Sequence, residues 1–266
     1  MIDRSAAALL ELATSTAAEA ATLIVEGLTR ARTMIETKTS GTDMVTEMDR
    51  ASEALILGRL DQARPNDAVL GEEGTDRTGT TGVRWIVDPI DGTTNYLYGH
   101  AGFAVSIAAE VDGVIMVGVV HDPLHGDVFS AVRGAGALRN GIPIAVSGET
   151  DLSRALVATG FSYEPDRRQR QAAVLGQIIG SVRDIRRMGA ASVDLCSVAC
   201  GRVDAYYERG LQPWDHAAGA LIATEAGALV GNLDGGAPEF DFCLAAPPAI
   251  FEPLRQLLLN ADAGNA

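Results

Sequence analysis

Two aspartates three positions apart, Asp88 and Asp91, interrupt an apolar run that continues directly into Gly92-Thr93-Thr94-Asn95. Two ionised carboxylates that lie close together repel each other unless a cation sits between them. Mg²⁺ prefers oxygen ligands and takes a few carboxylates, with water and substrate phosphate completing its shell. If the apolar run is a strand that ends at Asp88, the turn at Pro89-Ile90 lets both carboxylates point the same way. The stretch therefore indicates either a divalent-cation site or an acidic turn.

The four residues that follow the aspartates are expected to open a helix. Free backbone N–H groups at a helix start, together with the positive end of the helix dipole, can hold a phosphate. Gly92 allows close backbone approach, and the Thr93 hydroxyl can orient a water molecule. The alternative is an ordinary capped helix that follows an acidic turn. The spacing alone leaves both interpretations open.

Further acids stand at comparable places along the chain. Glu72 and Glu73 end the short apolar run that begins at Ala68, Glu208 ends "VDAYYE", and Asp215 lies in "PWDHAAG". Most surface acids only keep a protein soluble, so the argument for metal applies to a cluster rather than to any one of them.

The elements that must position these side chains begin with helices. Residues 5–35 are rich in Ala and Leu near helical spacing, which predicts one long amphipathic helix or two. The Ser, Gly and Thr content of residues 37–50 predicts a loop. Helical periodicity returns over residues 49–65, with Asp49 as the expected N-cap and Pro65 beyond the end.

Strands are predicted next. Short apolar runs over residues 68–74 and 84–88 end in the candidate acids, and from Phe103 the pattern becomes rich in β-formers. Asp112-Gly113 and Asn140-Gly141 are typical of tight hairpin turns.

After about residue 150 the order of elements changes. Strands alternate with helices, which predicts an α/β second half. We expect one phosphatase domain over residues 1–266, with subdomains 1–150 (helices plus an antiparallel sheet) and 151–266 (α/β). The expected later elements are a strand at 155–161, helices at 168–179 and 194–201, a strand at 203–208, and a helix followed by a strand over 215–230.

The overall composition excludes some functions. The 266 residues are 47% hydrophobic, enough for a substantial core. A formal charge of −14, from 35 acidic against 21 basic residues, argues against a nucleic-acid-binding surface, which needs clustered cations.

The same inspection bears on the compartment. Cys196, Cys200 and Cys243 follow no metal-ligand spacing and are interpreted as small core residues of a reduced, cytosolic protein. No run approaches the roughly 18 apolar residues of a membrane span. Glu11 interrupts the apolar part of the N-terminus, so no signal peptide is expected. We expect a soluble, cytoplasmic protein that does not bind membranes.

Taken together, five stretches resemble the inositol monophosphatase family, whose members are Mg²⁺-dependent, Li⁺-sensitive phosphatases related in fold to fructose-1,6-bisphosphatase. The resemblance covers nearly the whole chain and implies an α+β / α/β fold, a layered αβαβα sandwich. The stretches are "GTDMVTEMD" (41–49), "GEEG" (71–74), "WIVDPIDGTTNY" (85–96), "VDAYYE" (203–208) and "PWDHAAGALIATEAG" (213–227).

The resemblance implies a set of metal ligands. Glu72, Asp88 and the backbone carbonyl of Ile90 match the ligands of a first Mg²⁺. Asp88, Asp91 and Asp215 match those of a second. The family often shows a third, weaker Mg²⁺ near Glu72, so two or three ions are expected.

Further roles follow from the same resemblance. Thr93 and Asp49 match the pair that helps to polarise the attacking water, together with Glu72, and the amides of Gly92 and Thr93 are expected to meet the phosphate. Lys38 matches a flap lysine of the family.

For the substrate's hydroxyl groups, Glu208 matches an acid that hydrogen-bonds them, and Asp91 and Asp215 are expected to share this task. Gly189 and Ala190 match the loop that contacts the sugar ring largely through backbone groups. Ala190 stands where the family often has a hydroxyl residue.

The implied chemistry is two-metal hydrolysis, in which one ion lowers the pKa of a bound water and the other stabilises the leaving alkoxide. Such chemistry needs no Ser, Cys or His nucleophile. The four histidines are therefore interpreted as surface or structural residues: His100, His121, His125 and His216.

The expected activity is hydrolysis of inositol 1-phosphate, with a small phosphorylated polyol as the substrate class and a homodimer as the assembly. The same chemistry on histidinol phosphate, fructose 1,6-bisphosphate or a 3′-phosphonucleotide stays open. A second phosphate would need extra cations, and no cluster supplies them; Arg186-Arg187 is interpreted as a solvated pair. An interaction protein with residual phosphatase activity is the third possibility.

Overall fold

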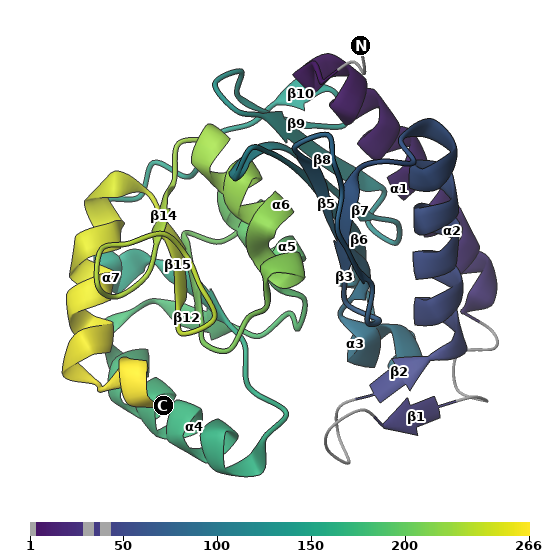
Figure 1. Ribbon diagram of the computed structural model, residues 1–266. Helices are drawn as coiled ribbons and strands as arrows, with labels where there is room; N and C mark the ends of the chain where they lie inside the picture. The colour runs from purple at the N-terminus through teal and green to yellow at the C-terminus, as the bar shows by residue number, and fades with distance from the viewer. Residues whose placement is uncertain (1–3, 29–34, 38–43) are drawn as a thin grey trace.

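The computed structural model describes residues 4–28, 35–37 and 44–266, and these form five layers in the order αβαβα. Helices cover the outer face of a first sheet, other helices lie between it and a second sheet, and further helices cover the far face of that second sheet (Figure 1). The predicted layered sandwich is confirmed.

The first outer layer consists of α1 (Ala6–Gly27) and α2 (Glu47–Ala63). The Ser5 side chain caps α1 by accepting a hydrogen bond from the Ala8 amide at 3.3 Å. The prediction of one long helix or two over residues 5–35 is wrong at its end, because Ile35 begins β1 (Ile35–Thr37); α1 ends at Gly27, and residues 29–34 lie outside the described residues.

The start of the second helix also differs from the prediction. The expected loop at 37–50 contains β2 (Met44–Thr46), which pairs with β1, and the first turn of α2. Residues 38–43, including Lys38, lie outside the described residues. Asp49 is therefore in the first turn of α2 and not at the N-cap. An acid in the first turn also interacts favourably with the helix dipole.

Helix α1 corrects the expectation about membrane spans. By length and composition its 22 residues are long and apolar enough to cross a membrane. Small side chains on one face, among them Ala13, Ala17 and Ala20, are fully buried against the first sheet in the same core cluster as Trp85 and Ile107. In the structure α1 thus packs as a core helix.

The first sheet has eight strands in the order β10-β9-β8-β7-β6-β5-β3-β4. It is antiparallel except for the parallel pair β3–β5, which the prediction of an antiparallel sheet missed. Asp112-Gly113 and Asn140-Gly141 form the predicted turns, with positive φ at all four residues. The strands are β3 (Ala68–Gly71), β4 (Asp76–Arg77), β5 (Val83–Asp91), β6 (Ala104–Val111), β7 (Val114–Asp122), β8 (Asp127–Val132), β9 (Ala137–Arg139) and β10 (Ile142–Pro143).

Strand β5 does not end at Asp88, as was predicted, but continues to Asp91. Asp88 pairs with Ser106 of β6, and Asp91 pairs with Ala104, so β5 holds one extra residue in this interval. In a regular strand, residues three apart face opposite sides of the sheet. The extra residue cancels this alternation, and both carboxylates face the space between the sheets.

The second sheet has five strands in the order β12-β11-β13-β15-β14, with β11 parallel to both β12 and β13. This confirms the predicted α/β character of the second half. Its elements are β11 (Leu156–Thr159), α4 (Pro165–Ile178), β12 (Asp184–Arg186), α5 (Ala191–Ala199), β13 (Ala205–Glu208), α6 (Pro213–Glu225), β14 (Leu229–Gly231), β15 (Cys243–Ala246) and α7 (Pro248–Asn260).

The middle layer joins the two halves of the chain. Helices α5 and α6 lie between the sheets, and their buried residues share one core cluster with Ile86 and Ala108 of the first sheet and Tyr206 and Cys243 of the second. The three cysteines are unpaired; Cys196 and Cys243 are buried and Cys200 is partly buried, as predicted. The space that holds the candidate site opens at one end of this layer.

Candidate active site

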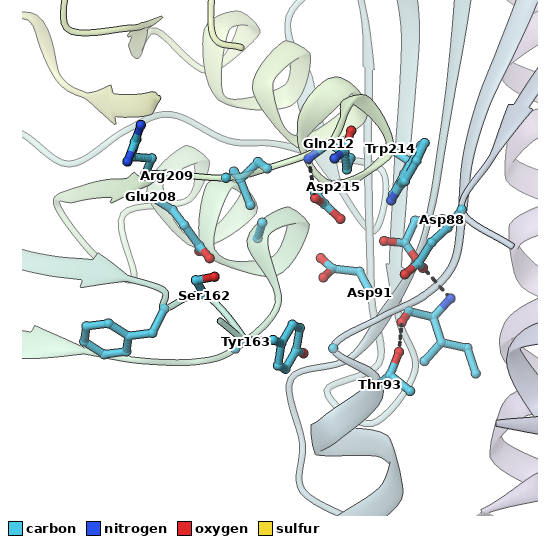
Figure 2. A pocket seen from close by; sticks show the side chains of 18 of the residues that line it. Asp88, Asp91, Thr93, Ser162, Tyr163, Glu208, Arg209, Gln212, Trp214 and Asp215 are labelled. Atoms are coloured by element: carbon cyan, nitrogen blue, oxygen red, sulfur yellow. Dashed lines mark hydrogen bonds between the residues drawn. The ribbon is translucent and has the colours of Figure 1, made fainter. Parts of the chain in front are cut away.

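The candidate site is a pocket of about 420 Å³ between the two sheets. Asp88, Asp91 and Asp215 point toward the same space, and Glu208 lies on its opposite side (Figure 2). Glu72 lines the pocket as well. Acids that are up to 143 positions apart in the sequence are thus brought together at the junction of the two halves.

Local structure fixes each aspartate. Asp88 Oδ1 accepts a hydrogen bond from the Ile90 amide at 3.0 Å, which holds the bulge of β5 in shape. Asp91 Oδ2 accepts from the Ser192 amide at the start of α5, at 2.7 Å. Asp215 is the third residue of α6, and its Oδ2 accepts from the Gln212 amide at 2.6 Å as part of a capping box.

The acids repel one another electrostatically. Burial raises the pKa of Asp88 well above its usual value, and the charges of Glu72, Asp91 and Asp215 raise it further. The pKa of Asp91 is raised to about 6 by burial, although hydrogen bonds from Ser192 lower it. Burial, then the charges of Asp91 and Glu72, raise the pKa of Asp215. A cation in this space would relieve that repulsion.

The donor set fits Mg²⁺. It is composed of carboxylate oxygens with the Ile90 carbonyl beside them, which are hard oxygen ligands. Within the described residues no group of three or more His, Cys, Asp or Glu side chains is placed so that it could by itself hold a metal ion. A shell shared with water and a substrate phosphate, which is the usual arrangement for Mg²⁺, does not require such a group.

Glu72 is positioned by a residue that the sequence did not identify. Glu53 of α2 is 4% exposed, and its carboxylate accepts hydrogen bonds from the Glu73 amide at 2.9 Å and the Thr75 hydroxyl at 2.6 Å. These bonds hold the turn after β3 that carries Glu72. Glu53 is one of several acids along a predicted helix, and nothing in the sequence distinguishes it for this role.

Thr93 and Asp49 meet as predicted. The Thr93 hydroxyl lies 3.2 Å from Asp49 Oδ1 and 3.1 Å from the Ile90 carbonyl, and its single hydrogen can serve one acceptor at a time. Asp49 is fully buried and does not line the pocket, but it contacts Thr93, which does. Gly92, at φ 89°, precedes the short helix α3 (Thr93–Tyr98).

Gly189 and Glu208 line the pocket, but Ala190 does not. Ala190 is 2% exposed, and its methyl group lies next to Gly92, where a Cβ would be 3.1 Å away. The backbone contact with substrate that the resemblance implied for Ala190 stays a prediction. Glu208 Oε2 accepts a hydrogen bond from the Tyr206 hydroxyl at 2.7 Å, and burial raises the pKa of Glu208 to about 7.

The interpretation of the four histidines as surface or structural is consistent with their positions, since none of them lines the pocket. Trp85 is fully buried, and its indole N–H donates to Asp67 at 2.9 Å, as expected of a packing residue.

The prediction that Arg186-Arg187 is a solvated pair is half right. Arg186 forms an exposed ion pair with Asp184 at 2.7 Å, but Arg187 lines the pocket. Arg209 lines it too, so cations are present near the site after all. The structure also buries Asp194 of α5 near Glu208 and Asp91; burial raises its pKa well above the usual value.

Comparison with known proteins agrees with the site. The family model described as "Inositol monophosphatase family" matches residues 6–261. The Inositol-1-monophosphatase SuhB of Mycobacterium tuberculosis is 46% identical over 246 residues, which cover 86% of this chain and 85% of that protein. The Nus factor SuhB of Pasteurella multocida is 40% identical over 230 residues, 86% of each chain.

A solved structure shows the same fold. The extragenic suppressor protein suhB of Bartonella henselae superposes with a TM-score of 0.90 at 35% identity, and covers 94% of this chain and 98% of that one. Family match, sequence identity and fold agree over nearly the full length. The chain therefore belongs to the inositol monophosphatase family of phosphatases.

Proposed function

We propose that the protein is a Mg²⁺-dependent phosphomonoesterase that hydrolyses inositol 1-phosphate to myo-inositol and phosphate. The observation that carries this proposal is the convergence of Glu72, Asp88, Asp91 and Asp215 on one pocket. Burial raises the pKa of the three aspartates, and the charges of neighbouring acids raise the pKa of Asp88 and Asp215 further. Carboxylates that lie this close together stay ionised only when a cation is bound among them.

Within this proposal the acids divide between two ions. Glu72, Asp88 and the Ile90 carbonyl would hold the first, and Asp88, Asp91 and Asp215 the second, with a third ion near Glu72. When bound, Mg²⁺ supplies activation of a water nucleophile and stabilisation of the leaving oxygen. The chain's own contribution is to keep these oxygens fixed through the Ile90, Ser192 and Gln212 amides.

The residues beside the acids would act on the phosphate and on the water. Gly92 and Thr93 line the pocket at the β5–α3 junction, and their amides would donate to phosphate oxygens. The Thr93 hydroxyl, backed by buried Asp49, would accept or pass on a proton of the attacking water together with Glu72.

The opposite wall would bind the leaving polyol. Glu208 would accept hydrogen bonds from substrate hydroxyls, and Asp91 and Asp215 would share this task at the boundary with the metals. Gly189 would contribute backbone contacts. Ala190 would add a backbone contact to the ring, while its methyl group packs next to Gly92.

We further propose that residues 1–266 act as one phosphatase domain in the cytoplasm, as a homodimer and with Li⁺ sensitivity. The shared core cluster of the two sheets supports a single unit, and the unpaired cysteines are compatible with a reducing compartment.

A second function, as a protein-binding factor, is supported by the 40% identity to a protein named Nus factor SuhB. The formal charge of −14 favours contact with a protein over direct contact with nucleic acid. Failure of the tagged protein to retain any transcription component from its own cell extract would contradict this second function.

The first function is tested by phosphate release from inositol 1-phosphate, histidinol phosphate and a 3′-phosphonucleotide, with Mg²⁺ or with chelator. We expect Mg²⁺-dependent release, fastest from inositol 1-phosphate. Asp91→Asn removes one ligand charge and should lower kcat/KM at least about 100-fold, or about 2.7 kcal/mol of transition-state stabilisation.

Asp112→Asn is the matched control, because Asp112 is an exposed turn residue at φ 50°, a conformation that Asn tolerates. It should retain wild-type activity. Full activity in chelator, or of Asp91→Asn, would refute the metal mechanism, whereas a preference for histidinol phosphate would change only the substrate.

A further inference from the structure

The pocket is lined by two arginines, and they differ in what they contact. Arg209 donates to the carbonyl oxygen of Ala266 and lies 3.6 Å from Asp241, so its charge is engaged behind the pocket wall. Arg187 is exposed, and its guanidinium forms no hydrogen bond or ion pair within the part of the chain that the structure describes. It is a pocket cation that is available to a ligand.

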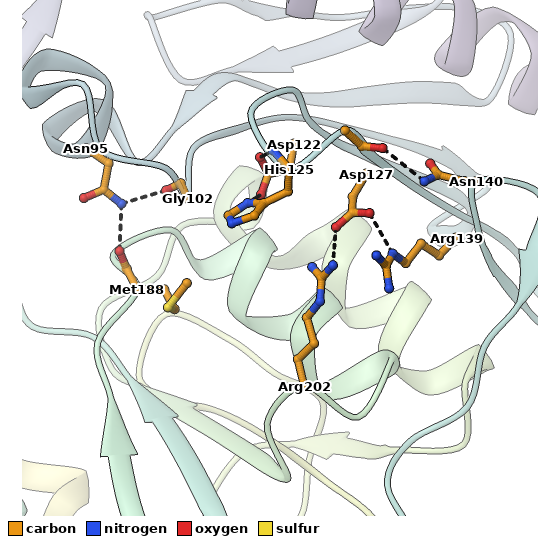
Figure 3. Close-up of polar contacts among 10 residues, drawn as sticks. Asn95, Gly102, Asp122, His125, Asp127, Arg139, Asn140, Met188 and Arg202 are labelled. Atoms are coloured by element: carbon orange, nitrogen blue, oxygen red, sulfur yellow. Dashed lines mark hydrogen bonds and ion pairs between the residues drawn. The ribbon is translucent and has the colours of Figure 1, made fainter.

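The turn that carries Arg187 is held from across the site. The Asn95 side-chain amide donates to the carbonyl of Met188 and to that of Gly102, both at 2.7 Å (Figure 3). Asn95 belongs to the first half of the chain and Met188 to the second. The Asn95 side chain, which had no predicted role, thus fixes the 187–189 turn relative to the acids of β5.

Glycine at position 189 is required for the direction that Arg187 takes. Gly189 has φ 93°, and a Cβ there would lie 2.1 Å from Arg187 Nη1. The guanidinium therefore lies directly over this glycine. Any larger residue would displace Arg187 and strain the backbone.

The surroundings of the guanidinium place it on the leaving-group side. Arg187 lines the pocket beside Gly189, and both belong to the second half of the chain, as does Glu208 on the proposed polyol side. The charge of Arg187 also lowers the pKa of Glu208 and Asp194, each of which burial raises. An anion bound to Arg187 would sit away from the phosphate that is hydrolysed.

We propose that Arg187 is a specificity-determining residue that binds a second anionic group, a phosphate or a carboxylate, on the leaving group of the substrate. The planar fork of a guanidinium matches the oxygens of either group in a bidentate arrangement. This inference rests on the proposed phosphatase function and extends its substrate class to phosphorylated sugars that carry a second charge.

The test compares kcat/KM for inositol 1-phosphate, fructose 1,6-bisphosphate and 6-phosphogluconate, the last of which carries a phosphate and a carboxylate. Wild-type enzyme should hydrolyse at least one of the doubly anionic substrates, and the preferred one identifies the second group. Arg187→Gln should raise KM for that substrate about 10- to 100-fold. The effect on inositol 1-phosphate should be much smaller, because Arg187 acts on that substrate only through its effect on the pKa of Glu208.

Two further variants separate binding from mere positioning. Arg187→Lys keeps the charge without the fork and should recover part of the lost KM. Arg186→Gln, one residue away and outside the pocket, should match wild type on all three substrates.

Three results would overturn the inference. The first is an equal loss on all three substrates in Arg187→Gln, which would mean that Arg187 only positions the acids. The second is an equal effect in Arg186→Gln. The third is normal wild-type hydrolysis of inositol 1-phosphate with no turnover of either doubly anionic substrate. Absence of hydrolysis of every phosphomonoester would instead overturn the proposed function, and this inference with it.

Discussion

Glu208 changes its protonation near neutral pH. Burial raises its pKa to about 7, while the hydrogen bond from the Tyr206 hydroxyl and the charge of Arg187 oppose the rise. A protonated Glu208 carboxyl carries one O–H donor, whereas an ionised Glu208 carboxylate only accepts hydrogen bonds and can accept them from several hydroxyl groups. Its role toward a polyol therefore depends on pH.

We predict that KM for inositol 1-phosphate falls as pH rises from about 6 to 8, since Glu208 ionises over that range and becomes an acceptor. The expected change is about three- to tenfold, the value of one hydrogen bond to a charged group. Steady-state kinetics at saturating Mg²⁺ measure it. Glu208→Gln, which cannot ionise, should show a high KM without this inflection; the same inflection in that variant would assign it to another group.

At the scale of elements, the site depends on how closely neighbouring strands approach. In the parallel pair β11–β13, Thr159 is in register with Tyr207, so Gly160 lies beside Glu208. A Cβ on Gly160 would be 1.9 Å from Glu208 Oε2. The strand order of the second sheet therefore positions the Glu208 carboxylate, and a glycine at the end of β11 is a condition for it.

Gly160→Ala should displace the Glu208 carboxylate and raise KM about tenfold or more. A shift of about 1 Å in a group that binds substrate is enough to disrupt its hydrogen bonds. A larger effect on KM than on kcat is expected, since the metal-side acids remain in place. Kinetics on inositol 1-phosphate measure both constants.

Gly176→Ala serves as the control for the same chemical change. Gly176 lies in α4 with no atom near the position of a Cβ, so alanine should stabilise the protein by about 0.5–1 kcal/mol without affecting KM. Unchanged KM in Gly160→Ala would refute the proposed role of this contact.

At the scale of the whole molecule, charged residues tie the first sheet to the middle layer. Asp127 of β8 is 1% exposed; Arg139 of β9 lies 2.7 Å from one of its oxygens and Arg202, between α5 and β13, lies 2.6 Å from the other (Figure 3). Burial alone would raise the pKa of Asp127, but hydrogen bonds from both arginines lower it overall. The pair with Arg202 joins the two halves that together form the pocket.

Asp127→Asn should lower the free energy of unfolding by about 1–2 kcal/mol at pH 7, less than for a fully buried pair because both arginines are partly exposed. Since the folded pKa lies below the ordinary value of 3.8, this stabilisation is complete above that value and is lost as pH falls through the folded pKa. Urea unfolding of both proteins at several pH values measures the difference.

Asp184→Asn is the control at this scale, because it removes an exposed pair with Arg186 at 2.7 Å and should change stability by less than about 0.5 kcal/mol. Equal effects of the two variants would mean that Asp127 contributes no more than a surface pair.

Local patterns predicted much of the fold. Alternating apolar residues and Asp-Gly or Asn-Gly turns identified the hairpins of the first sheet, and helical spacing identified α1, α2, α4, α5 and α6. The predictions failed where a neighbour in space decides the local structure. The strand β2 exists only through its pairing with β1, and the end of β5 depends on its pairing with β6.

The sequence by itself determined the family, because five stretches in order resemble it and the comparisons agree. The types and spacing of the carboxylates alone left a cation site and an acidic turn both open. Only the tertiary structure decided which side chains meet. Three features depend on contacts between residues distant in sequence. They are the bulge that turns Asp88 and Asp91 to one side, the contact of Glu53 with the turn that carries Glu72, and the Asn95 hydrogen bonds that hold the turn next to Arg187. Such contacts form only when the layers pack together, and no local pattern in the sequence predicts them.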